Sequence, residues 1–348
     1  MSSGYLVLED GSVFPGRSVA AEGAAFGEAV FTTAMTGYQE TVTDPSFVGQ
    51  LVCFTAPMVG NYGLADSRLE SGRPWANAVL MRHCGGEEWA SWLASNGIVA
   101  LDGLDTRALV LHIRDAGAMR AAAVADGSVL PVAEALEQVR AQPPMEGQAL
   151  VSAVSRVEPT VFNEEGRARV AVVDYGAKTS IMRRLRHAGA AVTVFPHFAD
   201  PDELAGFDGV LLSNGPGDPE PLTAEVEAIQ GLLGRTSVLG ICLGHQLLGL
   251  ATGHGTYKLP FGHRGTNHPV LERATGRVLV TSQNHGFAVR ATDPQEATYV
   301  SLYDGTVEGF DFPDLNARSV QFHPEAGPGT HDAWPILERW VADLVEAA

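Results

Sequence analysis

Residues 237–251 read SVLGICLGHQLLGLA, an apolar run whose period changes part-way. Residues 237–241 are typical of a short buried strand, and residues 243–251 carry the longer pattern of a helix. Cys242 stands at the junction, with Gly240 and Gly244 two residues away on either side. Such glycines let a strand and a helix approach closely through a strained turn. The pattern therefore predicts the cysteine form of a nucleophile elbow.

The elbow gives Cys242 the surroundings of a reactive thiol. Free N–H groups and the dipole at a helix N-terminus favour a thiolate, and the N–H of Leu243 is placed to donate to an oxyanion. Gln246 lies about one turn further on the same helical face, so we expect its amide to reach a substrate. A small buried core cysteine is the alternative. The flanking glycines, and the two residues described next, favour the nucleophile.

A base and a carboxylate that could orient it occur near the C-terminus. Residues 319–325 read SVQFHPE, a strand that leads into His323-Pro324-Glu325. Side chains two apart on an extended segment point to the same side, and Pro324 keeps His323 out of the α region. We therefore expect His323 to act as base to Cys242 and Glu325 to fix the imidazole tautomer. This is the logic of a catalytic triad with a thiol.

A glycine-rich loop follows another apolar strand. Residues 208–213 read DGVLLS and precede NGPGDP at 214–219. In open α/β sheets, ligands bind outside the carboxyl ends of the strands, so the N–H of Gly217 is a candidate second oxyanion donor. An ordinary turn is the other interpretation, because Pro-Gly and Gly-Asp-Pro are common in turns.

These segments resemble the class I (triad-type) glutamine amidotransferases. Further motifs extend the resemblance, over essentially the whole chain, to the small, glutamine-hydrolysing subunit of carbamoyl-phosphate synthase: GYQE at 37–40, TDPS at 43–46, GNYG at 60–63, DTR at 105–107, FGHRGTNHP at 261–269 and QNHGF at 283–287. The resemblance implies a catalytic triad of Cys242, His323 and Glu325. It also implies a glutamine site formed by Ser46, Gly215, Gly217, Leu243, Gln246, Asn284, Gly286 and Phe287. Ser46 has a second explanation, since Asp-Pro-Ser favours turns.

The length and the element pattern predict two α/β domains. A chain of 348 residues suits two domains of about 150 residues each. Residues 1–150 hold short apolar runs and helical stretches, and we expect a mixed α/β domain there, which the resemblance identifies as the N-terminal domain of the small subunit. We expect the polar stretch 151–166 to be a linker. In residues 167–348 strands and helices alternate, which predicts an amidotransferase domain with a mostly parallel sheet flanked by helices.

Charge and cysteine usage narrow the classes of function. The net charge of −18 argues against nucleic acid and anionic membranes as partners. The three cysteines show no metal-type spacing, so we expect neither a metal site nor a disulfide framework, and a reducing cytoplasm fits. The N-terminus has no signal-peptide pattern. Residues 236–257 lack charged residues over a bilayer-spanning length, but their glycines, histidine and glutamine suit a buried strand and helix better.

We therefore expect a glutaminase that converts glutamine and water to glutamate and ammonia. The resemblance implies a large partner subunit that uses ATP and Mg²⁺ to make carbamoyl phosphate for pyrimidine and arginine synthesis, in a cytoplasmic heterodimer or a higher oligomer of heterodimers. This chain has no phosphate-binding glycine motif, so we expect no cofactor in it.

Three alternatives remain open. One is a glutaminase that serves another synthase, such as anthranilate synthase, and the N-terminal domain argues against it. Another is a cysteine hydrolase that acts without a partner, which robust ammonia release by the isolated chain would favour. The last is a non-catalytic binding module, against which the intact triad argues.

Overall fold

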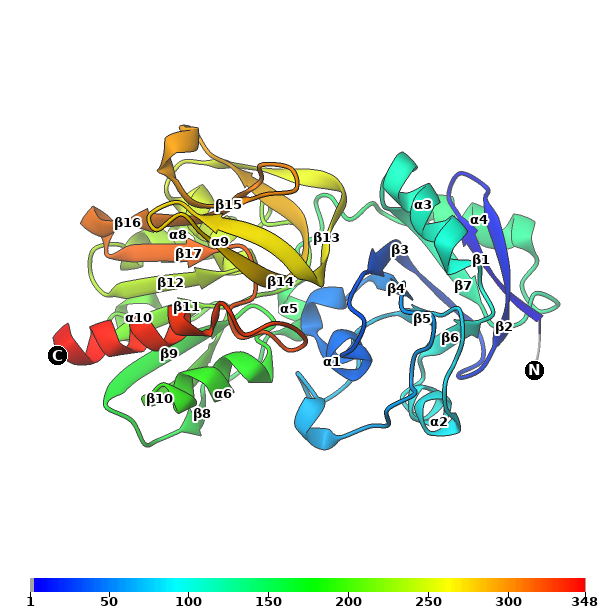
Figure 1. Ribbon diagram of the computed structural model, residues 1–348, viewed down its shortest axis with the longest axis horizontal. Helices are drawn as coiled ribbons and strands as arrows, with labels where there is room; N and C mark the ends of the chain where they lie inside the picture. The colour runs from blue at the N-terminus through cyan, green and yellow to red at the C-terminus, as the bar shows by residue number, and fades with distance from the viewer. Residues whose placement is uncertain (1–2, 348) are drawn as a thin grey trace. The chain divides into compact units, whose positions relative to one another are not determined.

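The computed structural model describes residues 3–347 and divides into two compact units (Figure 1). Unit 1 comprises the chain up to Glu146 together with Pro260–Arg264. Unit 2 comprises Gly147–Leu259 and the chain from Gly265 onward. The return to unit 1 takes place within one long strand, β13 (Gly255–Glu272). A division by sequence position alone therefore assigns residues 260–264 to the wrong side of the boundary.

Unit 1 is built on a closed barrel. Within the described residues, its strands follow the order β1-β2-β6-β5-β4-β3-β7. The barrel closes where Leu6 of β1 pairs with Ala123 of β7, and closure leaves no strand edge exposed. The strands β3, β4, β5 and β6 pair in parallel, and the remaining pairs are antiparallel. The bounds are β1 (Ser3–Leu8), β2 (Val13–Ser18), β3 (Ala24–Thr32), β4 (Gln50–Phe54), β5 (Ala78–Leu80), β6 (Val99–Asp102) and β7 (Met119–Val124).

Helices cover this barrel. In α3 the side chain of Asp105 caps the first turn by accepting from the N–H of Ala108, and Leu109 and Ile113 pack into the barrel core. These positions are four apart, so one face of the helix is apolar, as the sequence predicts. The helices are α1 (Tyr38–Thr43), α2 (Glu87–Ser95), α3 (Thr106–Ala116) and α4 (Val132–Ala141), with 3-10 turns at Pro45–Phe47 and Asp66–Arg68.

Unit 2 contains a sheet whose order, within the described residues, is β14-β13-β15-β16-β17-β12-β11-β9-β10-β8. The central strands β17, β12, β11, β9 and β10 are parallel. Antiparallel strands extend the sheet on both sides, so the expected mostly parallel sheet is its centre. The bounds are β8 (Thr160–Asn163), β9 (Ala168–Asp174), β10 (Ala190–Pro196), β11 (Gly209–Leu212), β12 (Ser237–Ile241), β14 (Arg277–Arg290), β15 (Ala297–Ser301), β16 (Val307–Phe312) and β17 (Ala317–Val320).

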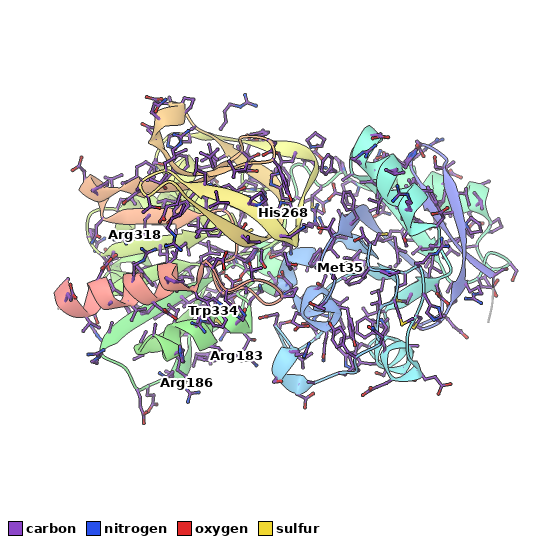
Figure 2. The ribbon with its side chains drawn as sticks, in the orientation of Figure 1. Met35, Arg183, Arg186, His268, Arg318 and Trp334 are labelled. Atoms are coloured by element: carbon purple, nitrogen blue, oxygen red, sulfur yellow. The ribbon has the colours of Figure 1, made fainter. Side chains whose placement is uncertain are left out.

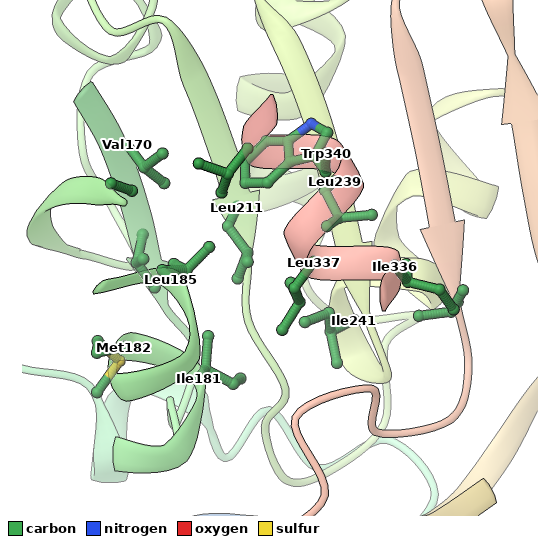
Figure 3. Packing of buried hydrophobic residues seen from close by; sticks show 14 of the residues in the cluster. Val170, Ile181, Met182, Leu185, Leu211, Leu239, Ile241, Ile336, Leu337 and Trp340 are labelled. Carbon is green, nitrogen blue, oxygen red and sulfur yellow. The ribbon is translucent and has the colours of Figure 1, made fainter. Parts of the chain in front are cut away.

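Each face of the parallel centre packs against its own helices. Leu239 and Ile241 of β12 face α6 (Thr179–His187) and α10 (Trp334–Ala347) in one apolar core, part of which Figure 3 shows. Val238 faces the opposite core, with α8 (Thr223–Leu232) and α9 (Leu243–Ala251). This alternation follows from the two-residue period of a strand. Two shorter helices are α5 (Val151–Val154) and α7 (Pro201–Leu204), and 3-10 turns occur at Pro294–Glu296 and Pro313–Leu315.

The stretch 151–166, expected to be a linker, contains α5 and the edge strand β8. β8 pairs antiparallel with β10, and most of its side chains are exposed. An edge strand exposed in this way lacks the apolar alternation that marks a half-buried strand, which is why the sequence pattern did not indicate it.

Residues 236–257 form β12, α9 and the start of β13. In residues 3–347 we find no helix of the length and hydrophobicity needed to cross a membrane.

Candidate active site

Cys242 lies at a sharp turn between β12 and α9 in unit 2. Its backbone has φ 54° and ψ −103°, in the region of positive φ that residues other than glycine rarely adopt. The neighbouring glycines are sterically required: a Cβ on Gly244 would lie 2.2 Å from the carbonyl oxygen of Leu212, and one on Gly240 would lie 2.6 Å from that of Gly244. Strain of this kind is typical of functional sites, and the geometry is that of a nucleophile elbow.

His323 and Glu325 follow β17 and lie together. The Nδ1 atom of His323 is 2.7 Å from Oε1 of Glu325, and both side chains are buried. Because a carboxylate can only accept, Nδ1 carries the proton and Nε2 is the nitrogen left for chemistry. Nε2 is buried and makes no hydrogen bond of good geometry to any described residue. His323 and Glu325 therefore have the arrangement of a catalytic base and the carboxylate that orients it.

The β14 strand and β17 bring Cys242 and His323 to one place. The N–H of Cys242 donates to the carbonyl of Val320, at 3.0 Å. Its Sγ atom is 3.6 Å from the carbonyl oxygen of Asn284, and the N–H of His323 donates to Ser282, on the same strand β14, at 2.9 Å. Cys242 and His323 thus both contact β14, although three strands separate β14 from β17 in the order of the sheet.

The charges of the site are strongly coupled. Burial lowers the pKa of His323, but the Glu325 carboxylate and Cys242 outweigh it and raise the pKa to about 10, against an opposing effect of Lys178. Burial raises the pKa of Glu325, but Lys178 and His323 together bring it down to about 2. At neutral pH His323 is therefore an imidazolium, paired with the ionised carboxylate of Glu325.

Lys178 is the residue of this site that the sequence reasoning missed. Its Nζ atom donates to Oε1 of Glu325 at 2.9 Å and to the carbonyl of Ala326 at 2.6 Å, and the side chain is 3% exposed. Lys178 immediately precedes α6, after the loop that follows β9. The position of Lys178 in the sequence could have indicated a role in the site, because the loops at the carboxyl ends of parallel strands meet where ligands bind.

The candidate oxyanion donors differ in their placement. The N–H of Leu243, at the first position of α9, has no acceptor among the described residues, whereas the next N–H, of Gly244, donates to Ser213 at 3.0 Å. Gly215 packs tightly against Leu243 and the carbonyl of Tyr175. Gly217, with φ 91°, packs against the carbonyl of Gln148. Leu243 and Gly215 therefore lie at the elbow, and the donor role of Gly217 stays a prediction.

Five residues of the expected glutamine site belong to the elbow helix and β14: Leu243, Gln246, Asn284, Gly286 and Phe287. Gln246 is buried, and its Nε2 atom donates to the carbonyl of Phe287 at 2.8 Å and to Oε1 of Gln321 at 3.2 Å. Its amide N–H₂ group thus ties α9 to β14 and to the segment before His323. Asn284 and Gly286 lie on the same strand β14 as Phe287, and the Asn284 carbonyl contacts Cys242.

Ser46 belongs to unit 1. There its N–H donates to Oδ1 of Asp44 at 2.9 Å, in a 3-10 turn that Asp44 caps. This matches the turn explanation of the Asp-Pro-Ser motif. A part of Ser46 in glutamine binding stays a prediction.

Comparison with known proteins identifies the family. The chain is 44% identical to the carbamoyl phosphate synthase small chain of Syntrophotalea carbinolica, covering 98% of this chain and 97% of the relative. It is 43% identical to the small chain of Xanthomonas campestris, with 98% of each covered, and 44% identical to that of Streptomyces coelicolor, with 97% of this chain and 94% of the relative covered. The chain belongs to the carbamoyl phosphate synthase small chain family.

Two family models match separate parts of this small-chain family member, and these parts correspond largely to its two units. The carbamoyl-phosphate synthase small chain domain matches residues 6–123, from β1 to the end of the last barrel strand, β7. The class I glutamine amidotransferase model matches residues 171–342, which include Lys178, Cys242, His323 and Glu325. The chain is therefore an enzyme subunit with a class I glutamine amidotransferase domain, as the resemblance in its motifs implies.

Proposed function

We propose that this chain is the glutaminase subunit of a carbamoyl-phosphate synthase. The observation that carries the proposal is the arrangement of Cys242 on a strained elbow with the buried His323–Glu325 pair, whose carboxylate lies 2.7 Å from the imidazole. Membership of the small chain family supports the substrate, glutamine, and a large-chain partner.

The chemistry assigns each group one task. The Cys242 thiolate attacks the side-chain amide carbon of glutamine, and the N–H of Leu243 donates to the oxyanion that develops. His323 gives its proton to the departing ammonia, and a cysteinyl thioester of glutamate remains. His323 then takes a proton from water, whose oxygen attacks the thioester carbon. Glutamate leaves, the Cys242 thiolate and the imidazolium are restored, and the sum is glutamine plus water giving glutamate plus ammonia.

The ammonia then serves a second reaction on the partner. We infer that a large subunit, with its own ATP and Mg²⁺, uses the ammonia to form carbamoyl phosphate for pyrimidine and arginine synthesis in the cytoplasm. The match of residues 6–123 to the small chain domain supports a role for unit 1 in this scheme. We propose that the working enzyme is a heterodimer of the two chains, or an oligomer of such heterodimers.

The substitution Cys242→Ser tests this proposal in the reconstituted complex with a carbamoyl-phosphate synthase large chain. We expect glutamine-dependent carbamoyl phosphate synthesis to be lost and synthesis from added ammonia to be retained, because only the thiol is removed. Cys53→Ser is the matched control, since Cys53 is a buried thiol in β4 of the barrel. Loss of both activities in the Cys242 variant would make this residue structural. If the rate of ammonia release were the same with and without the large chain, the result would instead favour a hydrolase that acts without a partner.

A further inference from the structure

Trp334 is the first residue of α10 and lies nine positions after Glu325. Its indole Nε1–H donates to the backbone carbonyl of Glu325, at 3.2 Å; the side chain of Trp334 is labelled in Figure 2. We propose that Trp334 is a positioning residue for the Glu325 carboxylate: it fixes the backbone from which this side chain reaches His323. The functional part of this inference rests on the proposed glutaminase, in which Glu325 orients the base.

The indole is itself held on both faces. The guanidinium carbon of Arg184 lies 3.7 Å from the indole ring, and the imidazole of His331 stacks on Trp334 with ring centroids 3.6 Å apart. Two groups this close to the same indole must lie on opposite faces, because on one face they would overlap. Arg184 is fixed in turn by an ion pair with Glu338, at 2.6 Å. A ring clamped in this way presents its N–H in one direction only.

Two cationic side chains support the backbone at Glu325 and Ala326, and both come from the region of α6. Lys178, which precedes the helix, donates to the Glu325 carboxylate and to the carbonyl of Ala326. Arg184, inside the helix, supports Trp334, which donates to the carbonyl of Glu325. Successive carbonyls, of residues 325 and 326, are therefore each held by a side chain.

The held turn has an unusual backbone. Ala326 has φ 64°, a left-handed conformation that a residue with a Cβ adopts only when its surroundings enforce it. Without the indole N–H, the carbonyl of Glu325 loses its donor and the turn is held from the Lys178 side alone. We therefore expect the Glu325 carboxylate to sit less well against His323. Small misplacements at a reacting centre reduce rates strongly.

Trp334→Phe is the variant that isolates the hydrogen bond, because it keeps an aromatic ring between Arg184 and His331. We expect kcat for glutamine-dependent synthesis to fall about 3- to 10-fold with KM nearly unchanged. The charged groups that face Glu325 are His323 and Lys178. The Glu325 carboxylate raises the pKa of His323, so a carboxylate that contacts the imidazole less well should lower this pKa. The alkaline limb of the kcat/KM profile should then move to lower pH, by about half a unit.

Trp340→Phe is the matched control. Trp340 lies on the same helix and is fully buried, and its indole N–H also makes one hydrogen bond, to Oγ of Ser237 at 3.0 Å. Ser237 begins β12, at the end of the strand away from Cys242. We expect this variant to lower the melting temperature while leaving the alkaline limb in place. Identical pH profiles and identical kcat in the two variants would overturn the positioning role and leave Trp334 a packing residue.

Alkylation of Cys242 by iodoacetamide separates this inference from the proposed function. If the parent complex makes no carbamoyl phosphate from glutamine, the proposed function fails. The positioning role then stands if Trp334→Phe slows alkylation at pH 8 several-fold relative to Trp340→Phe, and it fails if the two rates agree. Should Trp334→Phe fold poorly, Arg184→Gln removes the support from one face of the indole and must change the alkylation rate in the same direction.

Discussion

The ammonium of Lys178 donates to the same carboxylate oxygen of Glu325 that contacts His323, with Nζ 2.9 Å from Oε1. Glu325 is buried, as is Lys178, so the carboxylate is shared between two cationic groups out of reach of water. This relationship adds a fourth residue to the candidate triad. It also explains how a carboxylate can stay ionised in the interior, because a buried charge requires a partner and hydrogen bonds.

Removal of this ammonium is expected to weaken both stability and catalysis. Lys178→Met leaves Glu325 with less compensation, and breaking a buried ion pair by removing one partner costs about 3 kcal/mol or more. We expect glutaminase kcat/KM to fall at least about 10-fold, since the carboxylate that orients His323 is displaced. Chemical denaturation and steady-state kinetics measure the two effects. Arg186→Met, an exposed cation on the same helix α6, should change neither, and wild-type kinetics in Lys178→Met would refute the role.

The raised pKa of His323 predicts a particular dependence of stability on pH. An unfolded imidazole has a pKa of about 6.5, whereas that of His323 is about 10 in the folded chain. The folded protein therefore keeps a proton that the unfolded chain has released, and the stabilisation is complete below pH 6.5 and is lost as the pH rises towards 10. For Glu325, with its pKa lowered to about 2, the stabilisation is present above pH 4.5 and is lost as the pH falls towards 2.

We expect the free energy of unfolding of the wild-type chain to fall more steeply than that of His323→Asn between pH 6.5 and pH 10, by up to about 1.4 kcal/mol per pH unit. Denaturant titrations of the two proteins at several pH values measure this difference, and groups common to both proteins cancel. Parallel curves over this range would mean that His323 is not held as an imidazolium.

The elbow should not tolerate a methyl group at Gly244. Gly244→Ala would place a Cβ about 2.2 Å from the carbonyl of Leu212, at the end of β11. Strand β11 and helix α9 must then move apart, at a cost of about 3 kcal/mol. We also expect glutaminase activity to be lost, because Cys242 moves with the start of α9. Thermal unfolding and ammonia release measure the outcome.

Gly231→Ala is the matched control for this substitution. Gly231 lies in α8, and a Cβ there would meet only Pro201, at ordinary contact distance. Alanine should raise stability by about 0.5–1 kcal/mol, because it favours the helix. If Gly244→Ala behaved like Gly231→Ala, the close approach of α9 to β11 would not be needed for the fold.

The local pattern of the sequence was enough for the elbow and its helix. The strand 237–241 and the helix 243–251 occur where the apolar period changes, because periodicity and glycine positions are local properties of the chain. His323 and Glu325 do lie together, but the predicted extended segment is wrong: residues 324 and 325 form a turn, in which the N–H of Ala326 donates to the carbonyl of His323. A resemblance in motifs spread over the whole chain also indicates the family.

Other features needed contacts between residues far apart in the sequence. The barrel closes through pairs such as Leu6 with Ala123, and residues 260–264 belong with unit 1 although they follow it by more than a hundred positions. Lys178 meets Glu325 across 147 positions, and the amide of Gln246 donates to Phe287 and Gln321; its part in substrate binding stays a prediction.

The division follows from the range of each interaction. Propensity, periodicity and turn chemistry act over a few residues, so the sequence by itself determined the nucleophile elbow, the base with its carboxylate and the alternating elements around them. Which buried donor meets which buried acceptor depends on the packing of whole strands and helices. Only the tertiary structure therefore decided that Lys178 and Trp334 hold the Glu325 segment and that a lysine shares the carboxylate of the triad.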